Sequence, residues 1–198
     1  EHSENKIIID TLKKSISSEG SICYNNENIS ELNVNNIDST PIEYAMNVCS
    51  TLATHGGIEA AVLRDACESM ITLRKMIIQK DWNAVKKICD ENSKNFIELI
   101  NVQNEYKRAL EEAEDRIIIL TCIQACSIDS GGPSGIIGQM LLSTIDTRIL
   151  DTAINQARKW TCRSKKSKTC LKTCEILKSL RTSLTMSDWV GIEDILRD

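Results

Sequence analysis

Apolar side chains recur at helical spacing along much of this chain. From Leu63 to Ile77 they occupy every third or fourth position, and a similar stripe runs from Cys170 to Leu184. Such spacing places the apolar side chains on one face of a helix, which we expect to be buried. The first stripe comprises Leu63, Ala66, Cys67, Met70, Leu73 and Ile77, and the second comprises Cys170, Cys174, Leu177, Leu180 and Leu184.

A third, longer pattern runs from Trp82 to about Ser127, where the sequence has neither Gly nor Pro. Counted from Trp82 in alternating steps of three and four residues, ten of twelve positions are apolar, which predicts one amphipathic helix. At about 1.5 Å per residue it would span roughly 65 to 70 Å. Its polar exceptions, Asn92 and Gln103, leave open a break near Asn92 and Ser93 that gives two helices. The apolar seam predicted to face a protein partner comprises Phe96, Leu99, Tyr106 and Leu110.

The two shorter stripes belong to an internal duplication. Residues 67–88 align without a gap with residues 174–195, at an offset of 107 positions and with 7 identities in 22 positions. Repeats of this kind stack to build a shared core, so we predict one structural unit that occurs twice. The identical pairs are Cys67 with Cys174, Glu68 with Glu175, Leu73 with Leu180, Arg74 with Arg181, Asp81 with Asp188, Trp82 with Trp189 and Ile88 with Ile195.

The duplication extends upstream of this block. Ile37, Asp38, Ala45 and Asn47 recur 108 positions later as Ile145, Asp146, Ala153 and Asn155. The sequence therefore predicts an all-α fold, a tandem duplication of a helical-hairpin unit joined by a long central helix. We expect residues 1–90 to form copy one, residues 91–116 to be the linking part of the long helix, and residues 117–198 to form copy two.

The shared Asp and Trp pairs mark a corner in each copy. Asp81 and Asp188 each precede a new apolar periodicity, which suits an N-cap whose carboxylate accepts hydrogen bonds from free backbone amides. Trp82 and Trp189 then begin the next helix, where a large ring can wedge between the helices of the hairpin and bury about 150 to 250 Å². Recurrence in both copies favours this structural role over that of an exposed binding residue.

Composition is that of a soluble globular protein, with 41% hydrophobic and 26% charged residues. No stretch approaches the roughly 18 apolar residues that span a bilayer, so no membrane span is expected. Nine cysteines, an odd number at mostly helical spacing, favour a reducing compartment. We expect an intracellular, cytoplasmic protein, and a chain that begins with Glu1 leaves open that it is part of a longer one.

Candidate chemistry is sparse. Cys122 with Cys126 and Cys170 with Cys174 could each supply half of a metal site, but zinc needs further ligands and the only histidines are His2 and His55. The Gly-rich stretch 129–139 lacks the Lys and Ser or Thr of a phosphate-binding loop, and we interpret it, like the Asn-rich stretch 19–36, as an interhelical loop. We expect no catalytic residue, metal or cofactor, and therefore no enzyme.

One charged segment distinguishes the copies. Residues 158–181 hold nine Lys or Arg and one Glu, a local charge of +8 in a chain of net charge −4. The matching segment 51–74 holds only two basic residues, so the basicity belongs to copy two. It could bind an acidic protein, an anionic lipid surface or nucleic acid, or it could be a solvated helix face. The candidate binding residues are Arg158, Lys159, Arg163, Lys165, Lys166, Lys168 and Lys172.

This plan of duplicated helical hairpins resembles the broad class of helical-repeat scaffold proteins, over nearly the whole chain. The tetratricopeptide signature is absent, and a period near 107 residues is much longer than the period of that family. The resemblance implies a non-enzymatic protein–protein interaction or scaffolding module. The alternative is a binder of anionic phosphate surfaces, acidic lipid or nucleic acid, that uses residues 158–181.

Overall fold

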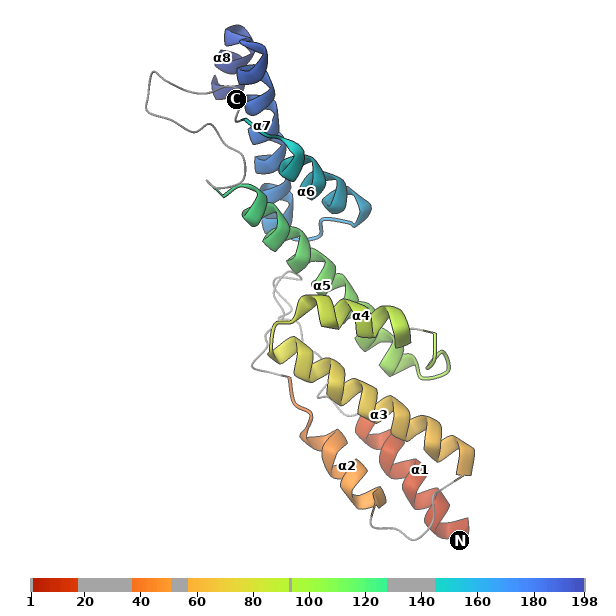
Figure 1. Cartoon of the computed structure of the whole chain (residues 1–198). Coiled ribbons are helices and arrows are strands. Elements are labelled where there is room, and N and C mark those ends of the chain that lie inside the picture. The colour runs from red at the N-terminus through yellow and green to blue at the C-terminus, as the bar shows by residue number, and fades with distance from the viewer. Residues whose placement is uncertain (1, 18–36, 51–56, 93, 128–144, 198) are drawn as a thin grey trace. The chain divides into compact units, whose positions relative to one another are not determined.

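The computed structural model describes residues 2–17, 37–50, 57–92, 94–127 and 145–197, and its regular elements over these ranges are all helices (Figure 1). The all-α prediction is therefore confirmed. The interpretations of residues 19–36 and 129–139 as loops fall outside the described residues. The helices are α1 (His2–Ser17), α2 (Thr40–Ser50), α3 (Gly57–Ile78), α4 (Trp82–Asn92), α5 (Ile100–Ala125), α6 (Arg148–Lys159), α7 (Lys165–Met186) and α8 (Trp189–Arg197).

The helices form two compact units. Unit 1 is Glu1–Ala113 and unit 2 is Glu114–Asp198, so the boundary falls inside α5. The first half of α5 belongs to unit 1 and the second half to unit 2. Residues 91–113, expected as part of a link between the copies, are part of unit 1.

The core of unit 1 is built around α3. This helix packs against α1 and α2 on one side of the unit and is followed by α4, which packs against it in turn (Figure 1). All six side chains of the first predicted stripe, from Leu63 to Ile77, are at most 2% exposed. Ile8 and Leu12 from α1 and Ile42 from α2 complete the centre of this core.

The core of unit 2 lies between the second half of α5, α6 and α7. Its α7 stripe is less enclosed than the stripe of α3, because only Cys174 among its predicted members is fully buried. None of the nine residues of α8 is buried. The buried side chains of this core are Ile118, Cys122, Ala125, Leu150, Ala153, Ile154, Ala157 and Cys174.

The prediction of one continuous helix from Trp82 to Ser127 is wrong, and the alternative break near Asn92 and Ser93 is the correct one. Helix α4 ends at Asn92 and α5 begins at Ile100. The Asn92 side chain donates a hydrogen bond to the carbonyl of Ile88 at 3.1 Å, and the backbone carbonyl of Asn92 accepts one from the N–H of Asn95 at 3.0 Å. Asparagine readily makes such local bonds, which compete with the helical pattern and favour its end.

The buried side of α5 also changes along the helix. In the first half the buried positions include Val102, Tyr106, Ala109 and Ala113, in steps of three and four. In the second half the buried positions include Asp115, 118, 122 and 125, with Ile117 and Ile119 buried beside 118, so the step from Ala113 to Asp115 is two residues. A side chain two positions along a helix points about 200° away. One helix therefore buries different faces in the two units.

Candidate interaction surface

The corner that joins α3 to α4 is closed by a set of local hydrogen bonds. Lys80 takes the left-handed conformation, with φ of 58°, and its N–H donates to the carbonyl of Ile77 at 2.9 Å. The N–H of Asp81 donates to the carbonyl of Met76 at 3.0 Å, which completes a Schellman motif. The Asp81 carboxylate then accepts from the N–H of Ala84 at 3.1 Å, as an N-cap of α4.

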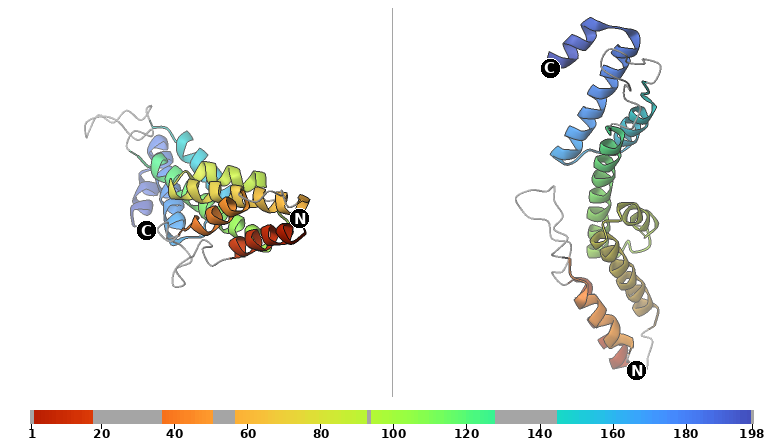
Figure 2. Two further views of the ribbon diagram at one scale, coloured as in Figure 1. Left: turned by 90° about the horizontal axis from the view of Figure 1, so that it is seen from below. Right: turned by 60° about the vertical axis from the view of Figure 1, so that its left-hand side comes forward.

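The corner that joins α7 to α8 has the same bonds 107 positions later. Ser187 is left-handed with φ of 54°, and its N–H donates to the carbonyl of Leu184 at 3.2 Å. The N–H of Asp188 donates to the carbonyl of Ser183 at 2.9 Å, and its carboxylate accepts from the N–H of Gly191 at 3.0 Å. The right-hand view of Figure 2 shows α8 following α7 through this corner.

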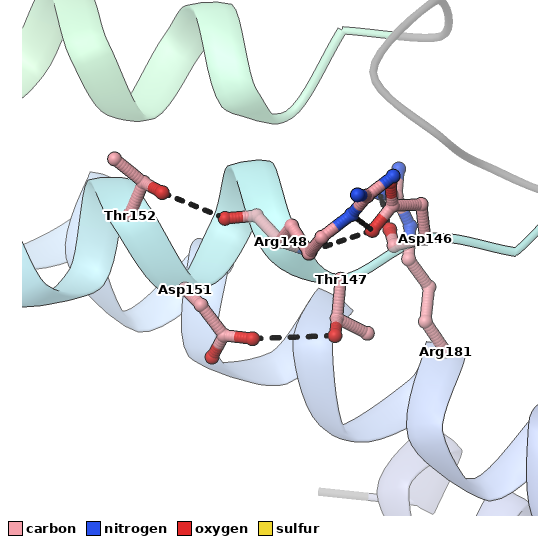
Figure 3. Close-up of polar contacts among 6 residues, drawn as sticks. All are labelled: Asp146, Thr147, Arg148, Asp151, Thr152 and Arg181. Carbon is pink, nitrogen blue, oxygen red and sulfur yellow. Dashed lines mark hydrogen bonds and ion pairs between the residues drawn. The ribbon is translucent and has the colours of Figure 1, made fainter.

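A second contact occurs in both units, where an arginine of the long hairpin helix meets the segment before a shorter helix. Arg74 on α3 donates through Nη1 to the carbonyl of Asp38, which precedes α2. Arg181 on α7 donates through Nη1 to the carbonyl of Asp146, which precedes α6, at 2.9 Å. Figure 3 shows Arg181 reaching from α7 toward Asp146. The same pair of residue types therefore makes the same backbone contact in each unit.

The two aspartates also make matching bonds to the start of the next helix. Asp38 Oδ1 accepts from the N–H of Thr40 at 2.8 Å, and Asp146 Oδ1 accepts from the N–H of Arg148 at 2.8 Å. The Arg148 guanidinium also folds over the Asp146 carboxylate (Figure 3). The hydrogen bonds from Arg148 lower the pKa of Asp146 to about 2, and those from Thr40 lower the pKa of Asp38.

In unit 1 the α3–α4 hairpin is covered by the first half of α5 and the turn before it. Arg74 donates to Glu105 through two bonds, from Nε at 2.7 Å and from Nη2 at 2.8 Å. The Tyr106 hydroxyl donates to the hydroxyl of Ser69, and burial raises the pKa of Tyr106 to about 12. The Phe96 ring stacks on Tyr106 with ring centroids 6.3 Å apart.

In unit 2 the residues that the structure describes cover the matching side of the α7–α8 hairpin less completely. Six apolar side chains of the first hairpin are at most 8% exposed, namely Met70, Leu73, Ile77, Trp82, Val85 and Cys89. Their counterparts 107 positions later are apolar too, but none of them is fully buried. Four are half-buried, among them Leu177, which packs against the core of unit 2, and the other two are exposed. Trp189 is 68% exposed where Trp82 is 8% exposed. We call these counterparts the hairpin face of unit 2, and they are Leu177, Leu180, Leu184, Trp189, Ile192 and Leu196.

The partner seam predicted from the sequence is not on this surface. The structure places Phe96 and Tyr106 inside unit 1, 6% and 1% exposed, and leaves Leu99 and Leu110 half-buried. This corrects the expectation of an exposed seam, because a helix that ends at Asn92 lets the following segment fold onto the hairpin. The hairpin face of unit 2 was missed, since its residues were interpreted as structural in both copies. Its signal was the shared tryptophan, which a single sequence can assign to either role.

The predicted basic residues lie at the end of α6, in the connection to α7 and in the first half of α7. All seven, from Arg158 to Lys172, are exposed, and Arg158 forms an ion pair with Glu175 at 2.9 Å. Several backbone amides around the start of α7 already have protein acceptors. The N–H of Ser167 donates to Ser164 Oγ at 3.0 Å, and the N–H groups of Arg163 and Ser164 donate to Asp115.

Asp115 is the buried anion of unit 2. Burial opposes its ionisation, but hydrogen bonds from the hydroxyls of Ser164 and Ser167 and from the N–H groups of Ser164 and Arg163 outweigh that effect and lower its pKa. The shortest of them joins Ser167 Oγ to Asp115 Oδ1 at 2.6 Å. The carboxylate thus organises the start of α7 rather than presenting a reactive group to solvent.

The cysteines of the described ranges are thiols. Burial raises the pKa of Cys67 to about 11 and of Cys89 to about 12, so both remain protonated at neutral pH. Cys126 and Cys174 lie with their sulfur atoms 3.3 Å apart. No cluster of His, Cys, Asp and Glu that could hold a metal ion occurs among the residues that the structure describes. Over the same ranges, no helix is long and apolar enough to cross a bilayer.

Comparison of the chain with models of protein families, with curated proteins and with solved structures found no match.

Proposed function

We propose that this chain is a non-enzymatic helical-repeat module that binds another protein through the hairpin face of unit 2. We further propose that α2–α4 and α6–α8 are two copies of one structural unit. The repeated corner at Lys80 and Ser187, and the repeated contact of Arg74 and Arg181 with an aspartate carbonyl, support this duplication. The two hairpins then differ in how they are covered, and not in how they are built.

The observation that carries the proposal is the difference in exposure between matched apolar positions. Trp189 is 68% exposed and Leu196 is 73% exposed, whereas Trp82 and Cys89 in the first hairpin are buried. Burying a large apolar side chain contributes about 1.5 to 3 kcal/mol. Covering the hairpin face would therefore contribute several kcal/mol, which is enough to hold a partner.

The shifted carboxylates have structural explanations, which is why we propose no catalytic role. Asp115 and Asp146 both have lowered pKa values, and both accept hydrogen bonds from backbone N–H groups near the start of a helix. A carboxylate held in this way is stabilised in its ionised form and is a weak general base.

A second candidate function is binding of an anionic phosphate surface by the basic residues of copy two. Lys165, Lys166 and Lys168 lie exposed at the start of α7, where the helix dipole disfavours positive charge. An anion would relieve this repulsion. Asp115 and Ser164 already accept from the backbone amides of Arg163, Ser164 and Ser167, so the contact would depend mainly on the lysine side chains. For this reason we place the phosphate surface second.

A photo-crosslinking experiment tests the first proposal against the second. A benzophenone amino acid replaces Trp189, and a matched control replaces Tyr44, which is also 68% exposed but lies in unit 1. Irradiation in extract of cells that express the chain should give a discrete protein adduct from position 189 and not from position 44. The adduct, identified and purified, should rebind the unlabelled chain.

Salt separates the two functions. An interface built on apolar side chains should survive about 0.5 M NaCl, where the Debye length is only a few ångströms. It should also survive replacement of Lys165, Lys166 and Lys168 by Glu. Loss of the adduct under both conditions would overturn the first proposal in favour of the phosphate surface, and equal labelling from positions 189 and 44 would overturn it outright.

A further inference from the structure

We infer that the partner covers the hairpin face of unit 2 with an amphipathic helix that carries phenylalanine at the place where α5 carries Tyr106. This inference rests on the proposed function and names the chemistry of the partner. It is drawn from the way in which unit 1 covers the same six positions of its own hairpin.

The form of the partner follows from the cover in unit 1. There, the first half of α5 contacts α3 through the bonds of Glu105 with Arg74 and of Tyr106 with Ser69, and Val102, Tyr106 and Ala109 are among its buried positions. The Tyr106 hydroxyl reaches Ser69 on α3, and Cys89, buried on α4, lies within electrostatic range of it. A helix with an aromatic residue one turn after a small apolar residue therefore fits a hairpin of this geometry.

The identity of the aromatic residue follows from one difference between the hairpins. Ser69 supplies the hydroxyl that accepts the hydrogen bond of Tyr106. The residue 107 positions later is Ile176, which is 43% exposed and has no acceptor in its side chain. A tyrosine hydroxyl buried against Ile176 would lose its hydrogen bond to water without replacing it, at a cost of about 1 to 3 kcal/mol. Phenylalanine avoids this cost and keeps the ring.

The counterpart of Cys89 also favours phenylalanine over tyrosine. Leu196 stands at that position, is larger than cysteine and is 73% exposed. The two side chains that would flank the ring in unit 2 are therefore isoleucine and leucine, in place of serine and cysteine in unit 1. The side chains around the ring would therefore be more apolar in unit 2 than in unit 1, and a wholly apolar ring complements them.

The test uses peptides of residues 97–113 as probes. They are acetylated, amidated and held helical by a lactam bridge between Asn104→Glu and Arg108→Lys, at positions that are both exposed in α5. One peptide keeps Tyr106 and the other carries Tyr106→Phe. Fluorescence anisotropy of each labelled peptide is measured against the full chain. We expect the Phe peptide to bind at least about fivefold more tightly, as the lost hydrogen bond requires.

Variants of the full chain show where the peptide binds. Trp189→Ala should weaken binding of the Phe peptide at least about tenfold, and Tyr44→Ala should leave it unchanged. Trp189 is too exposed for its removal to unfold unit 2, which circular dichroism at 222 nm verifies for each variant. Equal affinities of the two peptides, or binding that survives Trp189→Ala, would overturn the inference.

The remaining outcomes separate this inference from the proposed function. If the crosslinker at position 189 captures a protein while neither peptide binds, the helical partner is rejected and the binding role stands. If the Phe peptide binds as expected while no protein is captured, the proposed function fails instead. Sedimentation equilibrium of the chain alone addresses a second copy as the occupant. Self-association that Trp189→Ala abolishes would assign the face to that copy and overturn the inference.

Discussion

Glu105 offers the most direct test of how unit 1 is held together. Its carboxylate and the Arg74 guanidinium share two hydrogen bonds, of 2.7 and 2.8 Å, and the two side chains are only 2% and 3% exposed. Glu105→Gln keeps the shape of the side chain but leaves the arginine charge buried without a counter-charge. Breaking a buried pair in this way costs about 3 to 5 kcal/mol. That is a large part of the about 5 to 15 kcal/mol that stabilises a typical domain.

The assay is urea unfolding, followed through the fluorescence of Trp82 in a background where Trp160 and Trp189 are replaced by Phe. This isolates unit 1, since Trp82 is then the only tryptophan. The matched control is Glu59→Gln, because Glu59 pairs with Lys13 at 2.6 Å with both side chains more than half exposed. Such surface pairs contribute about 0 to 1 kcal/mol.

A further variant separates the charge from the packing. Glu105→Leu combined with Arg74→Met replaces the pair by apolar side chains of similar volume and should recover much of the loss, since no unpaired charge then remains. Recovery should be incomplete, because Met cannot donate to the Asp38 carbonyl as Arg74 does. If Glu105→Gln costs no more than Glu59→Gln, the buried ion pair does not stabilise unit 1 and the reasoning is refuted.

Three other predictions concern single contacts. Asp115→Ala should destabilise unit 2 by about 2 to 3 kcal/mol. Because the folded pKa of Asp115 is lowered, its contribution is complete above about 3.8 and is lost as the pH falls below that value, so urea titrations of the wild type should show an acid-side loss that Asp115→Asn reduces. Mild oxidation with diamide should join Cys126 to Cys174, whose sulfurs lie 3.3 Å apart, and peptide mapping that finds Cys174 bonded elsewhere would contradict the structure. Trp82→Ala should lower the free energy of unfolding by about 3 to 5 kcal/mol, whereas Trp189→Ala should change it by no more than about 0.5 kcal/mol. Thermal unfolding measures both changes, and losses of similar size would contradict the difference in burial.

The elements that the sequence predicted well are those set by local interactions. The stripe from Leu63 to Ile77 is buried throughout, because six apolar residues at helical spacing leave one helix little choice of inward face. The aspartates at positions 81 and 188 are N-caps, and a cap depends on amides only three residues away. Signals of this range can be read from one sequence.

The break between α4 and α5 was harder to predict. Phe96 lies in the connecting turn, yet its position continues the apolar spacing of the helices on either side, so the pattern looks uninterrupted. The change of buried face within α5 could not be predicted from the sequence either. Glu105 and Asp115 are buried although they are charged, and the partners that stabilise them lie on helices distant in the sequence.

The candidate surface could not be derived from the sequence, because burial depends on what the rest of the chain places over a residue. Trp82 and Trp189 each follow a left-handed residue and a capping aspartate and begin a helix, yet their exposure differs from 8% to 68%. Among the described residues, the first half of α5 packs on the hairpin that holds Trp82. An alignment of the sequence with itself shows which positions match, and a structure is needed to show which of them are covered.

The left-handed residues at the two corners have a consequence for engineering this chain. Lys80 and Ser187 hold φ values of 58° and 54°, where a residue with a Cβ is strained by about 1 to 2 kcal/mol. Glycine would relieve most of that strain, and the two sites lie in separate units, so the gains should add. Neither residue belongs to the hairpin face of unit 2. The corners therefore hold a reserve of thermal stability that substitution can release without altering the surface offered to a partner.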